Sequence, residues 1–213
     1  MDRDRFVALW RRCGHDSAPL DGADVYRELE ARYAEPHRYY HTGGHIIHCL
    51  RQMDLARSAL EVNLDTVEMA LWFHDAIYDV DRDDNERRSA QWFSRLAAPT
   101  LAPSLVAAVE RLIIVTEHAE SPRGADERYL VDVDLSSFGL PWPEFRRDSV
   151  AVRREFPAIS DAQFAARQIG FLRSLIERPS LYSTDFYRER YEHQARSNIG
   201  RHIALLDTGN GLS

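Results

Sequence analysis

Three separated stretches of the sequence place histidine or aspartate among hydrophobic residues. The six residues concerned are His41, His45, His74, Asp75, Asp132 and Asp134. Imidazole nitrogens and carboxylate oxygens form a ligand set that suits Mn, Fe, Co, Zn or Mg and leaves positions open for water and substrate. A buried imidazole beside a buried carboxylate is costly unless each has a partner, and a divalent cation is a partner for both. The pattern therefore predicts a mixed histidine and aspartate metal site.

The spacing around His74 predicts that its side chain points into the protein. A helix is expected to begin at Asp65, because Asp65 and Glu68 have the spacing of a capping box, and to continue through LWFHDAIYDV. On that helix His74 shares a stripe with Leu71, and Asp75 lies about 100° further round. A lone buried histidine is more often a hydrogen-bonded core residue than a ligand, and an Asp-x-Asp run is often a surface turn. The metal hypothesis therefore depends on the three stretches together.

The rest of the chain shows helical spacing and almost no strand pattern, which predicts an all-α fold. DERYLVDVDLSSFGLPWP (126–143) is the exception, and we expect it to be loop-rich with a short β-like run. Ser160 and Gln163 form a second expected capping box. The other helices are expected at 3–12, 23–34, from Thr42 onward, at 85–97, at 104–118, from Ser160 onward and at about 185–206.

Length and composition favour a globular domain without a membrane segment. A chain of 213 residues can form one domain with its own core, and no apolar run approaches the roughly 18–20 residues that cross a bilayer. The start MDRDRFVALW lacks the hydrophobic region of a signal peptide, and the two cysteines form no CxxC pair. We therefore expect a cytoplasmic protein. The net charge of −7 argues against binding of a nucleic acid polymer.

The order of these motifs resembles the HD superfamily of metal-dependent phosphohydrolases, and in detail a bacterial branch of predicted HD-domain hydrolases. The similar stretches are RYYHTGGHI (38–46), LWFHDAIYD (71–79), NERRSA (85–90), LVDVDLSSFG (130–139), RREF (153–156) and ERYEHQARSNI (189–199). The resemblance implies an HD-like helical bundle that forms a single domain over residues 1–213. Its metal-binding core would span about 36–140, with C-terminal helices at 160–206 packing on it.

The resemblance also implies a ligand set. Its first histidine matches His45, which precedes apolar helical turns, with His41 as the competitor. The last ligand of the family is the second aspartate of an Asp-x-Asp run, which leaves Asp132 as a capping or neighbouring group. The implied ligands are His45, His74, Asp75 and Asp134. We expect them to hold one divalent ion, either Mn, Mg, Co, Fe or Zn, because proteins of this type with two metals generally carry more histidines in the interval where this chain has only His118.

Proton transfer would need a carboxylate beside the metal-activated water. Several HD hydrolases have a glutamate four residues after the histidine of the pair, but here that position is Tyr78. Asp79 follows it and is the candidate base. The alternative is that Asp79 simply begins the solvated acidic loop DVDRDDNE.

Substrate contacts are expected from residues near the first ligand. Arg38, Tyr40 and His41 would offer a cation for phosphate, a ring for stacking and a second imidazole. His118 is interpreted as a substrate contact or an additional metal ligand. Arg196 and Asn198 are expected to be structural, with the arginine paired to Glu155 or another acid.

The sequence thus predicts a metal-dependent phosphohydrolase that acts on a small phosphorylated substrate, a nucleotide or another phosphate ester or anhydride. One alternative is an HD-type di-iron oxygenase, in which a second iron would recruit His118 and His41. The other is a non-catalytic nucleotide-binding or regulatory protein that keeps the metal ligands for stability.

Overall fold

The computed structural model describes residues 1–15, 21–58 and 61–209, and these residues confirm the all-α prediction. They form ten α helices and one short 3₁₀ helix, and none of these helices is long and apolar enough to cross a membrane. The elements are α1 (Arg3–Cys13), α2 (Gly22–Tyr33), α3 (Gly43–Ala56), α4 (Leu64–Phe73), α5 (Asn85–Ala97), α6 (Pro103–Val115), α7 (Ala125–Asp134), η1 (Leu135–Gly139), α8 (Trp142–Arg154), α9 (Asp161–Ile176) and α10 (Asp185–Asp207).

The helices divide into two compact units, Met1–Asp134 and Leu135–Ser213. The first unit contains α1 to α7 and therefore all of the predicted metal ligands. The second contains η1 and α8 to α10. The single domain predicted for residues 1–213 stays a prediction.

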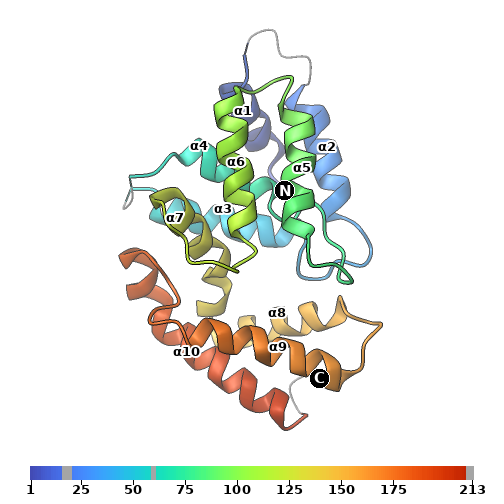
Figure 1. The fold of residues 1–213 in the computed structure, drawn as a ribbon, viewed down its shortest axis with the longest axis vertical. Helices are drawn as coiled ribbons and strands as arrows, with labels where there is room; N and C mark the ends of the chain where they lie inside the picture. Colours follow the sequence, from blue (N-terminus) through green and yellow to red (C-terminus); the bar gives the residue numbers. More distant parts are fainter. Residues whose placement is uncertain (16–20, 59–60, 210–213) are drawn as a thin grey trace. The chain divides into compact units, whose positions relative to one another are not determined.

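Helix α4 is the centre of the first unit. Its residues Thr66–Phe73 are all buried, and the helix packs against α1, α3, α5, α6 and α7. Helices α5 and α6 pack side by side in opposite directions (Figure 1). Arg5 of α1 joins two neighbouring helices, because it donates to Glu68 of α4 at 2.7 Å and to Asp54 of α3 at 2.6 Å. The buried Glu68 carboxylate is thus neutralised by a guanidinium.

The capping box predicted at Asp65 and Glu68 is wrong, because both side chains bind arginines of α1 instead. Asp65 pairs with Arg12, and the N-cap of α4 is Asn63, whose side chain accepts from the amide of Thr66. Helix α4 also ends at Phe73, earlier than expected, so the stretch that follows forms turns. Tertiary contacts of Asp65 and Glu68 with α1 have therefore replaced the capping box predicted between them.

The loop and β-like run predicted at 126–143 are also wrong. This stretch contains α7, η1 and the beginning of α8, a helix that the sequence did not single out. Alternating valine and aspartate suggested a strand, but Tyr129–Val133 is buried along its whole length. A helix satisfies its own backbone groups there without a partner strand.

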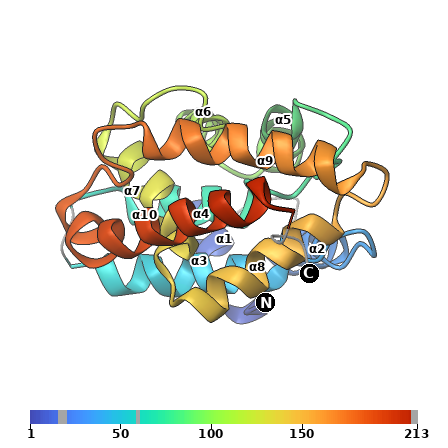
Figure 2. The same ribbon diagram turned by 90° about the horizontal axis from the view of Figure 1, so that it is seen from below.

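The second unit is built around the long helix α10, which packs against η1 and lies beside α9 (Figure 2). The approach of η1 is close, because a Cβ atom at Gly139 would lie 2.5 Å from the Cβ of Tyr191. Asn198 donates to the carbonyls of Phe138 and Leu140 at 2.8 and 2.7 Å. Its contacts are those of a structural residue, as predicted.

Arg196 also makes structural contacts. Its guanidinium donates to the carboxylate of Glu192 at 2.5 Å and to the backbone carbonyls of Ile176 and Arg178 at 2.7 and 2.8 Å. The acid that pairs with it is therefore Glu192, one helical turn earlier, and not Glu155. This arginine ties the end of α9 to α10.

Candidate metal centre

Three helix ends bring the predicted ligands together in the first unit. His45 lies in the first turn of α3, whose N-cap Thr42 accepts a hydrogen bond from the amide of Gly44. His74 is the C-cap of α4, and Asp75 follows it in the turn. Asp134 is the last residue of α7. Because α3, α4 and α7 pack against one another, these ends can meet.

The donor atoms of the four side chains are close to one another. His45 Nε2 lies 3.2 Å from His74 Nε2 and 3.1 Å from Asp134 Oδ1. His74 Nε2 lies 3.1 Å from Asp75 Oδ2 and 3.5 Å from Asp134 Oδ1, and His45 Nε2 lies 3.5 Å from Asp75 Oδ2. All four side chains are at most 14% exposed.

These separations fit a common metal ion. Ligands about 2.0–2.2 Å from an ion are roughly 3.0–3.5 Å from each other in tetrahedral or octahedral geometry. His74 is also oriented as a ligand needs, because its Nδ1 lies 3.0 Å from the carbonyl of Leu71 and donates to it. Its Nε2, which faces Asp75 and His45, is then the nitrogen that loses its proton when an ion binds. The residues present thus fit a divalent cation.

The charges of the cluster are strongly coupled. Burial alone would lower the pKa of His74, but the carboxylates of Asp75 and Asp134 hold this pKa well above its usual value. Burial would likewise raise the pKa of Asp75, yet His74, and next His41, hold it below the usual value. The pKa of Asp134 is also depressed, against the effect of burial, by hydrogen bonds from His118, His45 and His74. Two buried carboxylates thus remain charged and require positive charge between them.

No protein-family model, curated protein or solved structure matches this chain.

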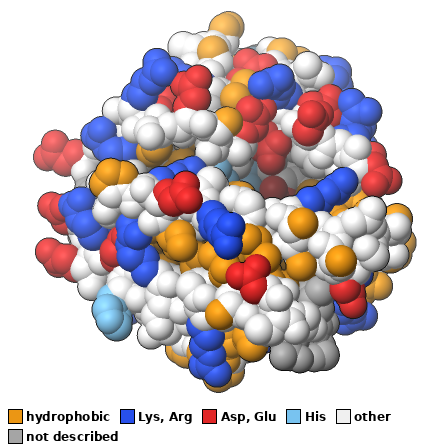
Figure 3. All heavy atoms as spheres, turned by 60° about the horizontal axis from the view of Figure 1, so that its bottom comes forward, with side chains coloured by type: hydrophobic (Ala, Val, Ile, Leu, Met, Phe, Trp, Pro, Cys, Tyr) orange, Lys and Arg blue, Asp and Glu red, His pale blue; other side chains and the backbone are white. Residues whose placement is uncertain are grey.

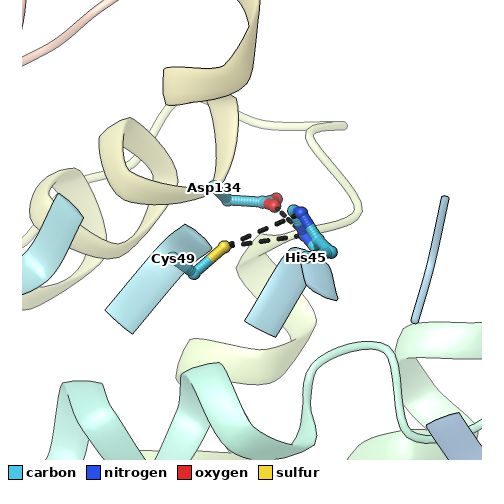
Figure 4. A group of neighbouring side chains, drawn as sticks. All are labelled: His45, Cys49 and Asp134. Carbon is cyan, nitrogen blue, oxygen red and sulfur yellow. Dashed lines mark hydrogen bonds and ion pairs between the residues drawn. The ribbon is translucent and has the colours of Figure 1, made fainter. Parts of the chain in front are cut away.

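Cys49 is a neighbour that the sequence analysis missed, although it lies one helical turn after His45 on α3. His45, Cys49 and Asp134 form a second group with donor atoms close enough to share an ion, and both Cys49 and Asp134 are directed toward the His45 ring (Figure 4). However, Cys49 Sγ lies 3.6 Å from Nε2 and 3.9 Å from Nδ1 of His45. The sulfur is therefore almost equally far from both ring nitrogens and does not lie in the direction of the Nε2 lone pair.

The chemistry of Cys49 agrees with this placement. The side chain is fully buried, and burial, with the charges of Asp134 and Asp75, raises the pKa of its thiol well above the usual value. A neutral thiol is a poor ligand compared with a thiolate. The group formed by His45, His74 and Asp75 is the better metal centre, and Cys49 is part of its wall.

Arg38 lies beside the centre, where it binds backbone groups. Its side chain is fully buried, and it donates to the carbonyls of His41, Asp75 and Ala76 at 3.1, 2.6 and 3.0 Å. Its Nε donates to Glu35 at 3.0 Å. These contacts make Arg38 a residue that fixes the turn after α4. The substrate contact expected of it stays a prediction.

Three partly exposed rings, those of Tyr40, His41 and Tyr78, form a chain of ring contacts that reaches His45. The His41 ring stacks on the Tyr78 ring with centroids 4.2 Å apart, and the Tyr40 ring lies 5.0 Å from that of His45. His41 is close enough to Asp75 to lower the pKa of that carboxyl group. It is not in either of the groups that could hold a metal, among the residues described. Its predicted role in substrate binding is compatible with this place.

Asp79, the predicted base, lies in the acidic loop that follows. Its Oδ1 accepts from the amide of Asp81 at 3.1 Å, and its own amide donates to Asn85 at 3.1 Å. The carboxylate therefore stabilises a turn, and its catalytic role stays a prediction.

Glu86 is a second carboxylate near the centre, and the sequence analysis missed it. It lies in the first turn of α5, and burial, with the nearby charge of Asp75, raises its pKa. The signal was present in NERRSA, one of the stretches that carry the family resemblance. The structure adds that this glutamate lies near both Asp75 and His118.

Proposed function

We propose that this chain is a metal-dependent phosphohydrolase of the HD type, acting on a small phosphate ester or anhydride such as a nucleotide. The observation that carries the proposal is that the Nε2 atoms of His45 and His74 each lie 3.1–3.5 Å from an oxygen of both Asp75 and Asp134, at the ends of three packed helices. A bound divalent ion, either Mn, Mg, Co, Fe or Zn, would lower the pKa of a water ligand and polarise a phosphoryl oxygen.

The chain's own residues would hold and orient the reacting groups. Arg38 donates to the successive backbone carbonyls of Asp75 and Ala76 and so holds the Asp75 carboxylate in position. The partly exposed rings of Tyr40 and His41 offer surfaces on which a nucleobase can stack. Either Asp79 or Glu86 would accept the proton of the attacking water.

The hydrolysis balances with these groups alone. The water oxygen forms a bond to phosphorus, and the bond between phosphorus and the leaving oxygen breaks. One proton of the water passes to the carboxylate, and the leaving oxygen takes a proton from solvent. Water is the only other reactant, and no oxidant or reductant is required.

The surface supports a small substrate over a nucleic acid polymer. Acidic and basic side chains are interspersed over the face shown in Figure 3, and the net charge is −7. Polymer binding generally needs a continuous basic surface that neutralises many phosphates. A cytoplasmic location belongs to the same proposal, because nucleotides are abundant there.

The test is release of phosphate or pyrophosphate from a nucleotide panel in the presence of Mn, Co, Mg, Fe or Zn. We expect turnover with at least one of these ions and its loss in His74→Ala. His193→Ala is the matched control, because His193 is an exposed histidine of α10. Equal turnover by wild type and His74→Ala, or none with any ion, would contradict the proposal.

A further inference from the structure

His118 combines an unusual backbone with a contact to a predicted ligand. Helix α6 ends at Val115, and three residues later His118 has a φ of 55°, the only positive φ at a non-glycine residue among those described. This left-handed conformation is unfavourable for most side chains, although histidine adopts it more often than average. The conformation directs an imidazole of 11% exposure toward α7, where its Nε2 lies 3.0 Å from Asp134 Oδ2.

The two oxygens of Asp134 therefore face different partners. Oδ1 lies 3.1 Å from His45 Nε2 and 3.5 Å from His74 Nε2, on the side of the metal centre. Oδ2 is directed at His118. A carboxylate divided in this way presents one oxygen to an ion and has its other oxygen fixed by a hydrogen bond.

We propose that His118 is a positioning residue that donates its Nε2 hydrogen to Asp134 Oδ2 and so makes Asp134 a one-oxygen ligand of a centre with a single metal. The inference rests on the proposed metal centre and adds a role for His118 within it. A second metal between His118 and Asp134 would need further donors. Among the described residues, however, the two groups able to hold an ion are His45 with Cys49 and Asp134, and His45 with His74 and Asp75. Neither contains His118.

The alternative roles of His118 predict different chemistry. As a ligand, its Nε2 would be deprotonated and an ion would lie between it and Oδ2, about 2 Å from each. The observed 3.0 Å is the distance of a direct N–H···O hydrogen bond, and among the described residues no group of three donor atoms close enough to share an ion includes His118. If His118 bound substrate through Nε2, its hydrogen bond to Asp134 would break when substrate binds. Asp134 would then lose its orientation in the enzyme–substrate complex, where that orientation is required.

The experiment is a titration with Co(II) that records the number of ions bound, their affinity and the visible absorption spectrum. His118→Gln retains a donor at the same number of bonds from Cα as Nε2, whereas His118→Phe removes the donor and keeps a ring. We expect one Co(II) per chain in all three proteins. His118→Phe should bind it about 10- to 100-fold more weakly with an altered spectrum, and His118→Gln should stay within a few-fold of wild type.

The controls separate positioning from stability. Thermal unfolding of the metal-free variants should be similar for Gln and Phe, so a difference in Co(II) affinity reports the hydrogen bond. If His118→Phe does not fold, His118→Asn takes its place, because asparagine tolerates a positive φ but does not reach Oδ2. His193→Phe is the matched exposed control.

Three outcomes would overturn the inference: two Co(II) in wild type and one in His118→Phe, wild-type affinity in His118→Phe, or equal weakening in both variants. The measurement requires no turnover, so it remains decisive if no phosphate substrate is found. Failure of wild type to bind Co(II) would instead refute the metal centre itself.

Discussion

Arg38 donates a hydrogen bond of 2.6 Å to the backbone carbonyl of Asp75. The two residues are far apart in the sequence, and this bond joins the segment before α3 to the turn after α4. The guanidinium lies over the rings of Tyr33 and Tyr78 and is fully buried. One arginine thus couples the two segments that carry the histidine ligands.

Replacing Arg38 with methionine should lower the free energy of unfolding by about 3 kcal/mol or more, because it leaves three carbonyls without their donor and removes one of the two arginines that bind Glu35. Mn(II) affinity should fall as well, since the turn at Asp75 is released. Urea denaturation of the metal-free protein and isothermal titration measure the two effects. Arg147→Met is the control, because the Arg147 side chain is 70% exposed. Unchanged stability together with a raised KM would instead favour the substrate contact predicted from the sequence.

Metal affinity should decrease as the pH falls below neutrality. The pKa of His74 is raised well above its usual value in the metal-free protein, so His74 is protonated at pH 7 and must lose its proton to bind an ion. We expect release of about one proton per Mn(II) at pH 7, with affinity falling up to tenfold per pH unit. Calorimetry in two buffers of different ionisation enthalpy counts the protons. Binding without proton release between pH 6 and 8 would refute the protonated state.

The stability of the metal-free protein should also depend on pH, and the contribution of His74 should change with pH in the opposite direction to those of Asp75 and Asp134. The contribution of His74, whose pKa is raised, is complete below about pH 6.5 and is lost as the pH rises through the folded pKa. The contributions of Asp75 and Asp134, whose pKa values are lowered, are present above about pH 4 and are lost on acidification. Denaturation of wild type and His74→Ala from pH 4 to 9 should therefore converge at high pH. Parallel curves would show that His74 does not titrate in this way.

Glu86 and Asp79 are two candidates for proton transfer, and their variants should differ. We expect Glu86→Gln to lower kcat about 100-fold or more, because this carboxylate lies near Asp75 and has a raised pKa that suits a group exchanging protons. Asp79→Asn should have the smaller effect on kcat, since the Asp79 carboxylate accepts from the amide of Asp81. Both variants should bind Mn(II) as wild type does. A larger loss in Asp79→Asn would support the base predicted from the sequence.

Local sequence signals predict a helix correctly where its caps and apolar stripe come from neighbouring residues. Residues 85–97 were predicted with the bounds that α5 has, since the apolar residues lie on one stripe. The capping box of Ser160 and Gln163 is confirmed in both directions. Thr42 likewise begins α3 as expected and so places His45 in the first helical turn. Caps and periodicity act over a few residues, and one sequence contains them completely.

The features that failed depend on residues distant in the sequence. The end of α4 at Phe73 is stabilised by Arg38, and the beginning of α4 was misplaced because Asp65 and Glu68 bind α1. The positive φ of His118 belongs to the loop after α6, and no local sequence pattern predicts it. The six candidate residues stand out because histidine and aspartate are unusual in apolar surroundings, and the family resemblance selects four of them as predicted ligands. Their approach to 3.1–3.5 Å could come only from the packed helices.

His202 provides a test of buried charge away from the metal centre. It lies in α10 with 1% exposure, its ring packs edge-on against Phe145, and its Nδ1 has no hydrogen-bond partner among the described residues. Burial, with a smaller effect of Arg146, lowers the pKa of His202 to about 4. The folded protein therefore stays neutral at this position between about pH 4 and 6.5, whereas the unfolded chain takes up a proton.

Because the unfolded state binds the extra proton, His202 should reduce stability as the pH falls from 6.5 toward 4, by up to about 1.4 kcal/mol per pH unit. His202→Phe should remove this slope and raise the free energy of unfolding at pH 5 relative to wild type, while His193→Phe should leave it unchanged. Urea denaturation at several pH values gives the difference in free energy of unfolding between each variant and wild type. Because the residues of the metal centre are the same in all of these proteins, their titration cancels from this difference. If wild type and His202→Phe kept the same slope, His202 would have to be protonated in the folded protein, and a buried anion would have to lie beside it.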